Sequence, residues 1–464
     1  MRRALRRAGD RTVLTDAGGA ARTGAQLADR VARLAGALAG QGLAGRRIGL
    51  WYQNSIAAFE AFLAVEQIGA TRLPVEPAST APEARAIFDA GQADAVLADS
   101  RQAARLGGDV LIHDDQAPLL GPALAGERAV AADTPLVVYP RQVAGGQLFA
   151  VTTSYANWDA IMRVNCELYR RGWYGPGFGA GERLLTVQQL MHGTGMVASF
   201  PFLLMGLPQV VLPGFGADAV LDAVRRHQIT ATFTVPGMLT RLADRLGGAA
   251  ADLPLRHTLY GGAPVPAEEI RRLRTILGQS LVQLYGRFEA GWPLAVLGVD
   301  EHTAILNGDD HLGTSCGRPI PQVDIRIAGV PGQPPGHGEL QTRSPMVSPA
   351  FADPEGWCGL GDLAYRDSRG YLHLTGRLDG MINTGSYHVY PGQVEEVIAS
   401  VPGVAAVRVT GEPDPVWGQA VTAYVIPDDP AAWSGLTQRL AAELSARLAR
   451  YKIPKAIHKV TALP

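Results

Sequence analysis

The chain of 464 residues is longer than one ordinary hydrophobic core requires, so we expect two or more domains. Apolar residues make up 47% of the chain and charged residues 18%, a composition typical of folded globular proteins that excludes an intrinsically disordered chain. The formal net charge of −1 provides no global field that would favour a nucleic-acid partner or an anionic membrane.

The cysteines and the N-terminus predict a cytoplasmic location. Cys166, Cys316 and Cys358 are far apart and lack metal-ligand spacing, which fits buried thiols in a reducing compartment. The basic N-terminal stretch MRRALRRAGD is not followed by the apolar run that a secretion signal would have. No uninterrupted apolar run reaches the length of a membrane span. We therefore expect a cytoplasmic protein without a membrane partner.

The first 300 residues alternate short apolar strands with amphipathic helices. Apolar residues recur at helical spacing between positions 27 and 38, and the run RIGLWY that starts at Arg47 predicts a buried strand. Strands predicted near 210–212 and 232–235 flank a helix predicted over 217–226. This alternation predicts an α/β fold with mostly parallel sheets flanked by helices. From Ile320 onward, closely spaced strands and turns predict an additional β-rich layer.

The segment after Arg377 has the pattern of a small, separate α+β unit. It contains the strand-like runs AAVRVTG and AVTAYVIP, followed by a helix whose apolar residues between Trp433 and Leu448 lie on one face. The Arg377–Gly380 turn is the predicted boundary. We therefore predict a large N-terminal domain over 1–377, a hinge at 378–380 and a small mobile domain over 381–464.

Asp362 and Arg377 are the strongest candidates for a binding site. Asp362 ends an extended run, and Arg377 leaves the next strand on the other side of a hairpin. A carboxylate can accept two charge-assisted hydrogen bonds from the vicinal hydroxyls of a ribose. An isolated aspartate before a hairpin would more simply cap a turn. With Arg377 opposite it, Asp362 predicts a shared nucleotide site.

Four segments occur in an order that matches a known family. They are LMHGTGMVASFPFLLMGLPQVVLP (190–213), LYGGAPVP (259–266), QLYGRFEAG (283–291) and GDLAYRDSRGYLHLTGRLDGMINTGSYHVYP (361–391). Together they closely resemble the adenylate-forming superfamily of acyl- and aryl-CoA synthetases, luciferases and peptide-synthetase adenylation domains. The resemblance extends from about Ala8 to Pro464.

The resemblance implies a nucleotide site and a metal site. In such enzymes the position of Asp362 grips the ribose, and the position of Arg377 lies near ribose and phosphate. Glu289 would hold Mg²⁺, a hard cation that needs oxygen ligands. The residues implied for ATP or AMP binding are Gly261, Gly262, Ala263, Tyr285, Gly286, Asp362 and Arg377.

The resemblance also implies an acid pocket and a path for a thiol. His192 matches the position beside the substrate carboxylate, and Asp379 matches the hinge about which the small domain rotates between two half-reactions. The implied pocket residues are His192, Gly193, Gly195, Met205, Val235 and Gly261, and the implied thiol path contains Gly385, Ser386 and Tyr387. The expected substrate is a small carboxylic acid or its thioester, and the thiol belongs to coenzyme A or to the phosphopantetheine of an acyl carrier protein.

The chain departs from the family pattern in the phosphate-binding loop. Between Leu136 and Asn157 the family carries a Ser/Thr/Gly-rich loop ending in Pro-Lys-Gly, whose N–H groups, hydroxyls and lysine grip phosphates. Here the segment reads VVYPRQVAGGQLFAVTTSYANW, with Leu148 at the lysine position. Phe288 replaces a threonine that would bond the phosphate. The sequence also ends at Pro464, before the position of the family's terminal catalytic lysine.

Three functional hypotheses follow from this mixture of retained and altered motifs. The first is an acyl- or aryl-acid-activating ligase that forms an acyl-adenylate and then a thioester, with an impaired or altered adenylation step. The second is an ATP-independent acyltransferase between coenzyme A and a carrier-protein thiol. The third is a non-catalytic relative that binds a nucleotide, an acyl group or a partner. ATP–pyrophosphate exchange distinguishes the first from the others.

Overall fold

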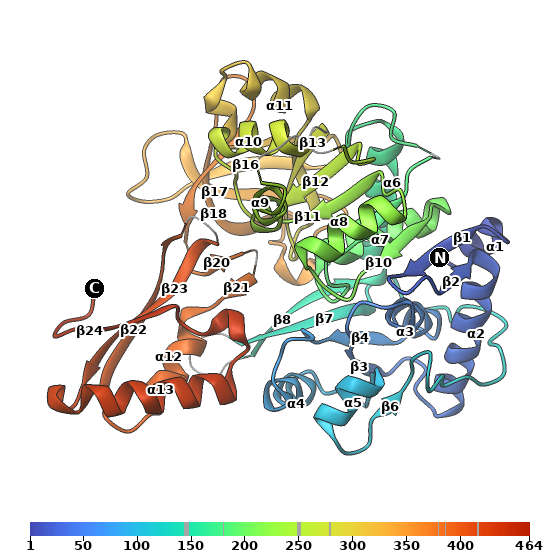
Figure 1. The fold of residues 1–464 in the computed structure, drawn as a ribbon, viewed down its shortest axis with the longest axis horizontal. Helices are drawn as coiled ribbons and strands as arrows, with labels where there is room; N and C mark the ends of the chain where they lie inside the picture. The colour runs from blue at the N-terminus through green and yellow to red at the C-terminus, as the bar shows by residue number, and fades with distance from the viewer. Residues whose placement is uncertain are drawn as a thin grey trace.

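The computed structural model describes residues 1–142, 148–179, 181–247, 252–277, 280–378, 380–385, 387–414 and 417–464. Within these ranges the chain forms three β-sheets with helices packed around them (Figure 1). The predicted fold class is confirmed, because a large sheet-rich α/β part is followed by a smaller α+β part.

The first sheet has six strands in the order β6-β5-β3-β4-β7-β8. All of its neighbouring strands are parallel except β7 and β8, which form an antiparallel hairpin. The strands are β3 (Arg47–Trp51), β4 (Thr71–Pro74), β5 (Ala95–Ala98), β6 (Leu111–Ile112), β7 (Pro135–Gln142) and β8 (Leu148–Ser154). The predicted strand at RIGLWY is β3, and four of its five residues are buried, as expected for a parallel strand covered on both faces.

The second sheet has thirteen strands in the order β16-β17-β18-β19-β15-β14-β13-β12-β11-β9-β10-β1-β2. Its strands are β1 (Thr12–Asp16), β2 (Ala21–Thr23), β9 (Leu184–Thr186), β10 (Gln209–Val211), β11 (Ala231–Thr234), β12 (His257–Gly261), β13 (Ser280–Arg287), β14 (Gly291–Leu297), β15 (Ser315–Pro319), β16 (Asp324–Gly329), β17 (His337–Arg343), β18 (Cys358–Arg366) and β19 (Leu372–Arg377). The pairs from β10 through β13 are parallel, and those from β13 through β19 to β16 are antiparallel.

The change from parallel to antiparallel pairing occurs earlier than predicted. The sequence indicates a β-rich layer from Ile320, whereas the antiparallel part already begins where β14 folds back on β13. Every residue of β14 is buried, so the strand is a continuous apolar run without the alternation that marks a half-exposed antiparallel strand.

Helices cover the faces of both sheets. They are α1 (Arg2–Ala8), α2 (Gly24–Gly40), α3 (Ile56–Gln67), α4 (Ala81–Ala90), α5 (Ser100–Leu106), α6 (Tyr155–Arg170), α7 (Gly193–Met205), α8 (Ala217–Arg226), α9 (Pro236–Arg245), α10 (Ala267–Leu277) and α11 (Val299–Leu306). α8 has the predicted bounds. α7 is apolar on all sides and mostly buried, which places it inside the molecule. None of the described helices combines the length and apolar character that a bilayer crossing requires.

The C-terminal unit, by which we mean the described residues from Met381 onward, has its own sheet and its own apolar cluster. The sheet contains β20 (Ile382–Thr384), β21 (Tyr387–Val389), β22 (Val404–Asp414), β23 (Gly418–Pro427) and β24 (Ala456–Lys459), packed with α12 (Pro391–Ala399) and α13 (Trp433–Arg447). The cluster is formed by buried residues between Ile382 and Leu448. Figure 1 shows this unit, in orange and red, at the end of the molecule away from α1 and β1. The predicted domain boundary at 378–380 stays a prediction.

Candidate active site

A cavity of about 370 Å³ lies where the parallel part of the thirteen-stranded sheet meets the C-terminal unit. Val187, Val235 and Gly262 line it, and each follows directly on the carboxyl end of a parallel strand, β9, β11 or β12. On the opposite side the lining includes Gly385 and Tyr387 of the C-terminal unit. Ligands of open α/β sheets bind at the carboxyl ends of the strands, so this position suits a binding site.

The walls of the cavity are mainly apolar and include several aromatic side chains. A ligand in this cavity would contact flat apolar surfaces on several sides, with a few polar groups such as His192 and the exposed Arg241 at its margin. This pattern suits a small organic molecule that has an apolar body and one charged end. The aromatic and methionine side chains that line the cavity are Tyr139, Trp158, Phe215, Phe288, Trp292, Tyr387, Trp417, Met196 and Met238.

Glycines allow the backbone to approach closely on two sides of the cavity. A Cβ atom on Gly193, the first residue of α7, would lie 2.7 Å from the ring of Phe288. A Cβ on Gly195 would collide with the backbone carbonyl of Gln189. A Cβ on Gly286 would overlap the indole of Trp292. Gly193 and Gly286 therefore allow the aromatic walls to pack, whereas Gly195, predicted for the pocket, is not among the residues that line the cavity and packs on the backbone of Gln189.

His192 faces a carboxylate that the sequence does not single out as a partner. The Nε2 atom of His192 and the Oε2 atom of Glu76 are 2.6 Å apart, with 22% and 7% of the two side chains exposed. The two atoms are too poorly aligned for a good hydrogen bond, and no other described group bonds either of them. The ring of Tyr387 from the C-terminal unit meets the His192 ring edge-on, with centroids 5.5 Å apart. The His192–Glu76 pair is thus a polar contact where the large part of the chain meets the C-terminal unit.

Asp362 and Arg377 are brought together as predicted. They are register partners on β18 and β19, and Arg377 Nη1 donates to Asp362 Oδ1 at 2.6 Å. The hydroxyl of Tyr285, on β13, donates to Asp362 Oδ2 at 2.6 Å. Burial and the nearby Asp362 carboxylate raise the pKa of Tyr285 well above its ordinary value, so it stays a donor. Each carboxylate oxygen of Asp362 keeps a second lone pair for a ligand hydroxyl.

The predicted adenine-side residues divide into a cavity wall and its support. Gly262 lines the cavity with a φ of 94°, and its carbonyl accepts a hydrogen bond from the Asn383 side chain of the C-terminal unit. Gly286 lines the cavity as well. Gly261 is buried behind them, under Trp292, and Ala263 is half-buried after the end of β12.

Glu289 sits beside a cation. Arg287 Nε lies 3.6 Å from Glu289 Oε2, and 9% and 16% of the two side chains are exposed. Arg287 lines the cavity, whereas Glu289 stands behind it. A Mg²⁺ ion commonly uses one or two carboxylates together with phosphate oxygens, so the Glu289 carboxylate fits as one ligand, in competition with Arg287.

Phe288 lies beside β7, the strand that precedes the altered segment. The Phe288 ring packs against the ring of Tyr139 on β7, with centroids 4.6 Å apart and planes inclined by 57°. The β7–β8 ladder continues to the pair Gln142↔Leu148. The central loop residues 143–147 lie outside the described residues. Phe288 and Tyr139 both line the cavity.

The thiol-path residues that the structure describes lie on the C-terminal side of the cavity. Gly385 has a φ of 59°, its N–H donates to the Trp417 carbonyl at 2.8 Å, and an added Cβ would lie 2.5 Å from the Trp417 ring. Tyr387 stacks on Tyr451 at 4.3 Å. Ser386 and the predicted hinge residue Asp379 lie outside the described residues.

The placement of Met205 is a correction. Met205 ends α7 and lines a different depression, beside Arg7 and Arg11, because a helix that starts at the cavity carries its thirteenth residue roughly 18 Å away. The three cysteines are buried free thiols, as predicted. Burial and the carboxylates of Glu289 and Glu339 raise the pKa of Cys358 to about 12.

Comparisons with known proteins agree with this geometry. The AMP-binding enzyme family matches residues 1–141 and 150–351, and the AMP-binding enzyme C-terminal domain matches residues 393–464. A feruloyl-CoA synthase from Amycolatopsis sp is 34% identical over 96% of this chain and 91% of its own length. An indoleacetate–CoA ligase from Aromatoleum aromaticum is 30% identical over 95% of this chain and 89% of its own length.

A solved structure gives the same answer for the fold. The amide bond synthetase from Marinactinospora thermotolerans matches with a TM-score of 0.84 at 28% identity, over 100% of this chain and 96% of that one. Both predicted parts of the chain are thus matched, in sequence and in structure. The chain belongs to the AMP-binding enzyme family, and it is an AMP-forming, acyl-CoA ligase-like member of the adenylate-forming superfamily.

Proposed function

We propose that this protein activates a small aromatic carboxylic acid as an acyl-adenylate and transfers the acyl group to the thiol of coenzyme A. The observation that carries the proposal is the shared cavity. Its aromatic residues on one side and His192 come from the part of the chain before the C-terminal unit, and its opposite wall includes Gly385 and Tyr387 of that unit. An acid held there lies within reach of a thiol that enters along the C-terminal side. Two relatives are named for aromatic acyl groups, feruloyl and indoleacetyl.

In the first half-reaction a carboxylate oxygen attacks the α-phosphorus of ATP, the bond to the bridging oxygen breaks, and pyrophosphate leaves. Asp362 would accept hydrogen bonds from the ribose hydroxyls, with Arg377 and Tyr285 holding the carboxylate in place. Glu289 would hold Mg²⁺ together with phosphate oxygens. The contribution of these residues is positioning and charge stabilisation rather than proton transfer.

In the second half-reaction the thiol sulfur attacks the acyl carbon, and AMP leaves with the electron pair of the broken acyl–oxygen bond. The thiol proton has to be accepted during this step. The His192–Glu76 pair contacts Tyr387 through the His192 ring, and we propose that it would hold this proton. The role of Gly385 would be to leave room for the thiol arm.

The test compares two aspartates that are each paired with an arginine. Asp362→Asn keeps the shape of the side chain but weakens the interaction with ribose, and we expect kcat/KM for ATP to fall about 10–100-fold. Asp324→Asn removes the partner of Arg343 at an exposed site and should leave kcat/KM unchanged. The measurement is ATP–pyrophosphate exchange and CoA-thioester formation with hydroxylated cinnamic and indole acids. An unchanged kcat/KM in Asp362→Asn contradicts the proposed nucleotide site.

The altered phosphate loop favours a second candidate, ATP-independent acyl transfer between two thiols. The family match leaves out residues 142–149, and the ring of Phe288 takes the place of the threonine hydroxyl and packs on Tyr139. The pairing of β7 with β8 up to Gln142 commits alternate backbone N–H groups to the ladder instead of to a phosphate. All three features weaken the grip on a triphosphate while the thiol side is retained.

An exchange experiment without nucleotide separates the two candidates. An aryl-CoA is incubated with pantetheine, as a mimic of a carrier-protein arm, in the presence and absence of ATP. Acyl transfer at the same rate in both mixtures favours the second candidate. Transfer that requires nucleotide, together with pyrophosphate exchange, favours the first. Saturable binding of the acid without any product would favour a non-catalytic relative.

A further inference from the structure

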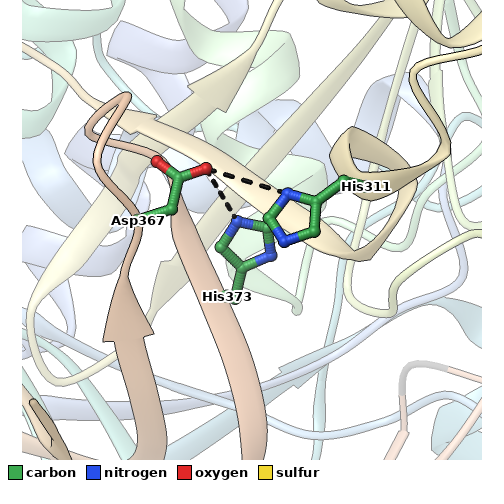
Figure 2. Close-up of side chains that lie close together, drawn as sticks. All are labelled: His311, Asp367 and His373. Atoms are coloured by element: carbon green, nitrogen blue, oxygen red, sulfur yellow. Dashed lines mark hydrogen bonds and ion pairs between the residues drawn. The ribbon is translucent and has the colours of Figure 1, made fainter.

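We propose that His311, Asp367 and His373 form a binding site for a divalent transition-metal ion of the Zn²⁺ class, separate from the active site. His311 lies in the short 3₁₀ helix η2 (Asp310–Thr314), Asp367 follows β18, and His373 is in β19. Figure 2 shows the three side chains pointing toward one another, with the Asp367 carboxylate facing both imidazole rings. One ligand atom from each residue lies within 4.8 Å of the others.

The distances from the Asp367 carboxylate to the two imidazoles are close to those around a tetrahedral ion. Zn–N and Zn–O bonds of about 2.0–2.2 Å place neighbouring ligand atoms about 3.4 Å apart. Asp367 Oδ2 lies 3.3 Å from His373 Nε2 and 3.8 Å from His311 Nδ1. Two imidazole nitrogens and one carboxylate oxygen suit zinc and neighbouring first-row metals better than Mg²⁺, which prefers oxygen ligands alone. Half of the His311 side chain is exposed, so a water molecule can complete the coordination.

The remaining polar atoms of the ligands already have partners. His373 is buried, its Nδ1 lies 3.0 Å from the Thr314 hydroxyl, and its ring stacks on Tyr365 with centroids 4.7 Å apart. Asp367 Oδ1 accepts hydrogen bonds from the N–H groups of Arg369 and Tyr371, both at 2.9 Å. These contacts leave Oδ2 and the His373 Nε2 atom facing each other. Such outer contacts orient metal ligands and raise affinity.

Arg369 is the competitor of the metal ion. Its guanidinium contacts His311 Nδ1 at 3.3 Å and Asp367 Oδ2 at 3.6 Å, which are two of the proposed ligand atoms. It also pairs with Asp309 at 2.5 Å, and 41% of its side chain is exposed. Binding of the ion requires the Arg369 guanidinium to move away from His311 and Asp367. The guanidinium can do so while it stays paired with Asp309. The metal affinity is therefore set by an exchange of one cation for another.

The test titrates the metal-stripped full-length protein with Zn²⁺ in calorimetry and with Co²⁺ in visible absorption. We expect one ion per chain, with the intense d–d bands of tetrahedral Co²⁺. His311→Ala, which removes the more exposed ligand, should weaken binding at least about 100-fold. Arg369→Gln removes the competitor, so binding should strengthen by up to about fivefold. His458→Ala removes an exposed histidine of the C-terminal unit and serves as the control.

Thermal unfolding provides a readout independent of activity. Zn²⁺ bound to the native state should raise the melting temperature of the wild type and of His458→Ala, but not that of His311→Ala. Absence of saturable 1:1 binding in the wild type overturns the proposal. Equal affinity in wild type and His311→Ala also overturns it. Weaker binding in Arg369→Gln would show that the guanidinium supports the metal site. That result would contradict the proposed competition between Arg369 and the metal ion.

Discussion

His302 is buried in the large sheet-rich part, where two neutral partners hold its imidazole. Its Nε2 lies 2.9 Å from the Tyr260 hydroxyl and its Nδ1 lies 2.6 Å from the Gly298 carbonyl. Burial disfavours the charged imidazolium and lowers the pKa of His302 to about 4. In the unfolded chain the imidazole has a pKa near 6.5. Between pH 6.5 and about pH 4, the imidazole is therefore protonated in the unfolded chain but neutral in the folded protein.

Stability is expected to depend on pH through this residue. The contribution of His302 is fully present above about pH 6.5 and is lost as the pH falls toward about 4, because only the unfolded state gains the proton. Relative to His302→Gln, the wild type should lose on the order of 1–3 kcal/mol across this window. Urea unfolding followed by circular dichroism measures the difference, and the exposed His458→Gln is the control. A wild-type advantage that grows on acidification contradicts the prediction.

Sequence reasoning at the level of single residues succeeds where partners share a local element. Asp362 and Arg377 flank one hairpin, so their pairing follows from strand geometry. Glu76 and His192 are far apart in the chain and meet only because the end of β4 lies close to the start of α7. The glutamate before a loop gives no signal of that meeting. The prediction for Met205 is wrong for the opposite reason. Met205 is close to His192 in sequence, but the length of α7 separates the two residues in space.

At the scale of elements, one glycine in the β20–β21 hairpin shapes the C-terminal side of the cavity, where we propose the thiol path. The positive φ of Gly385 and its contact with Trp417 both exclude a side chain. The glycine-rich pattern predicts the turn, but Trp417 comes from the connection between β22 and β23 and is found only in the folded chain. The register of β7 and β8 similarly becomes visible only in the structure.

Gly385→Ala should slow thioester formation selectively. The added methyl group meets both the backbone strain and the Trp417 ring, so we expect the rate of acyl transfer to CoA to fall about tenfold or more. ATP–pyrophosphate exchange should change less, because the nucleotide residues lie on other elements. Gly336→Ala has a comparable positive φ of 79° in open space and controls for strain alone. An equal loss in both half-reactions argues against a thiol-path role.

At the scale of the whole molecule, the C-terminal unit is docked on the large part by an ion pair outside the cavity. Lys452 Nζ lies 3.0 Å from Glu83 Oε1, with 13% and 7% of the side chains exposed. Glu83 also closes a capping box with Thr80 at the start of α4. One carboxylate thus serves a local helix start and a contact between distant parts of the chain. The capping pattern is readable from sequence, and the docking role is not.

Glu83→Gln should loosen this docking without unfolding α4. Glutamine keeps the capping box, as Gln26 does for Thr23 in α2, but removes the charge that faces Lys452. We expect a larger maximum dimension in small-angle X-ray scattering and thioester formation slowed roughly threefold to tenfold. Lys459→Ala removes a lysine whose ammonium group donates to the Pro430 carbonyl within the same unit, and it should change neither quantity. An unaltered scattering profile in Glu83→Gln contradicts the docking role.

The split lining of the cavity has a consequence for substrate choice. Because Gly385, Tyr387 and Trp417 complete the wall, an acid that touches both sides binds more tightly when the unit is docked. Thermodynamic reciprocity then requires that the same acid strengthen docking by the same factor. An acid that is too bulky opposes docking to an equal extent. The enzyme would therefore select its acid twice, once as the acid enters and again as the wall closes behind it.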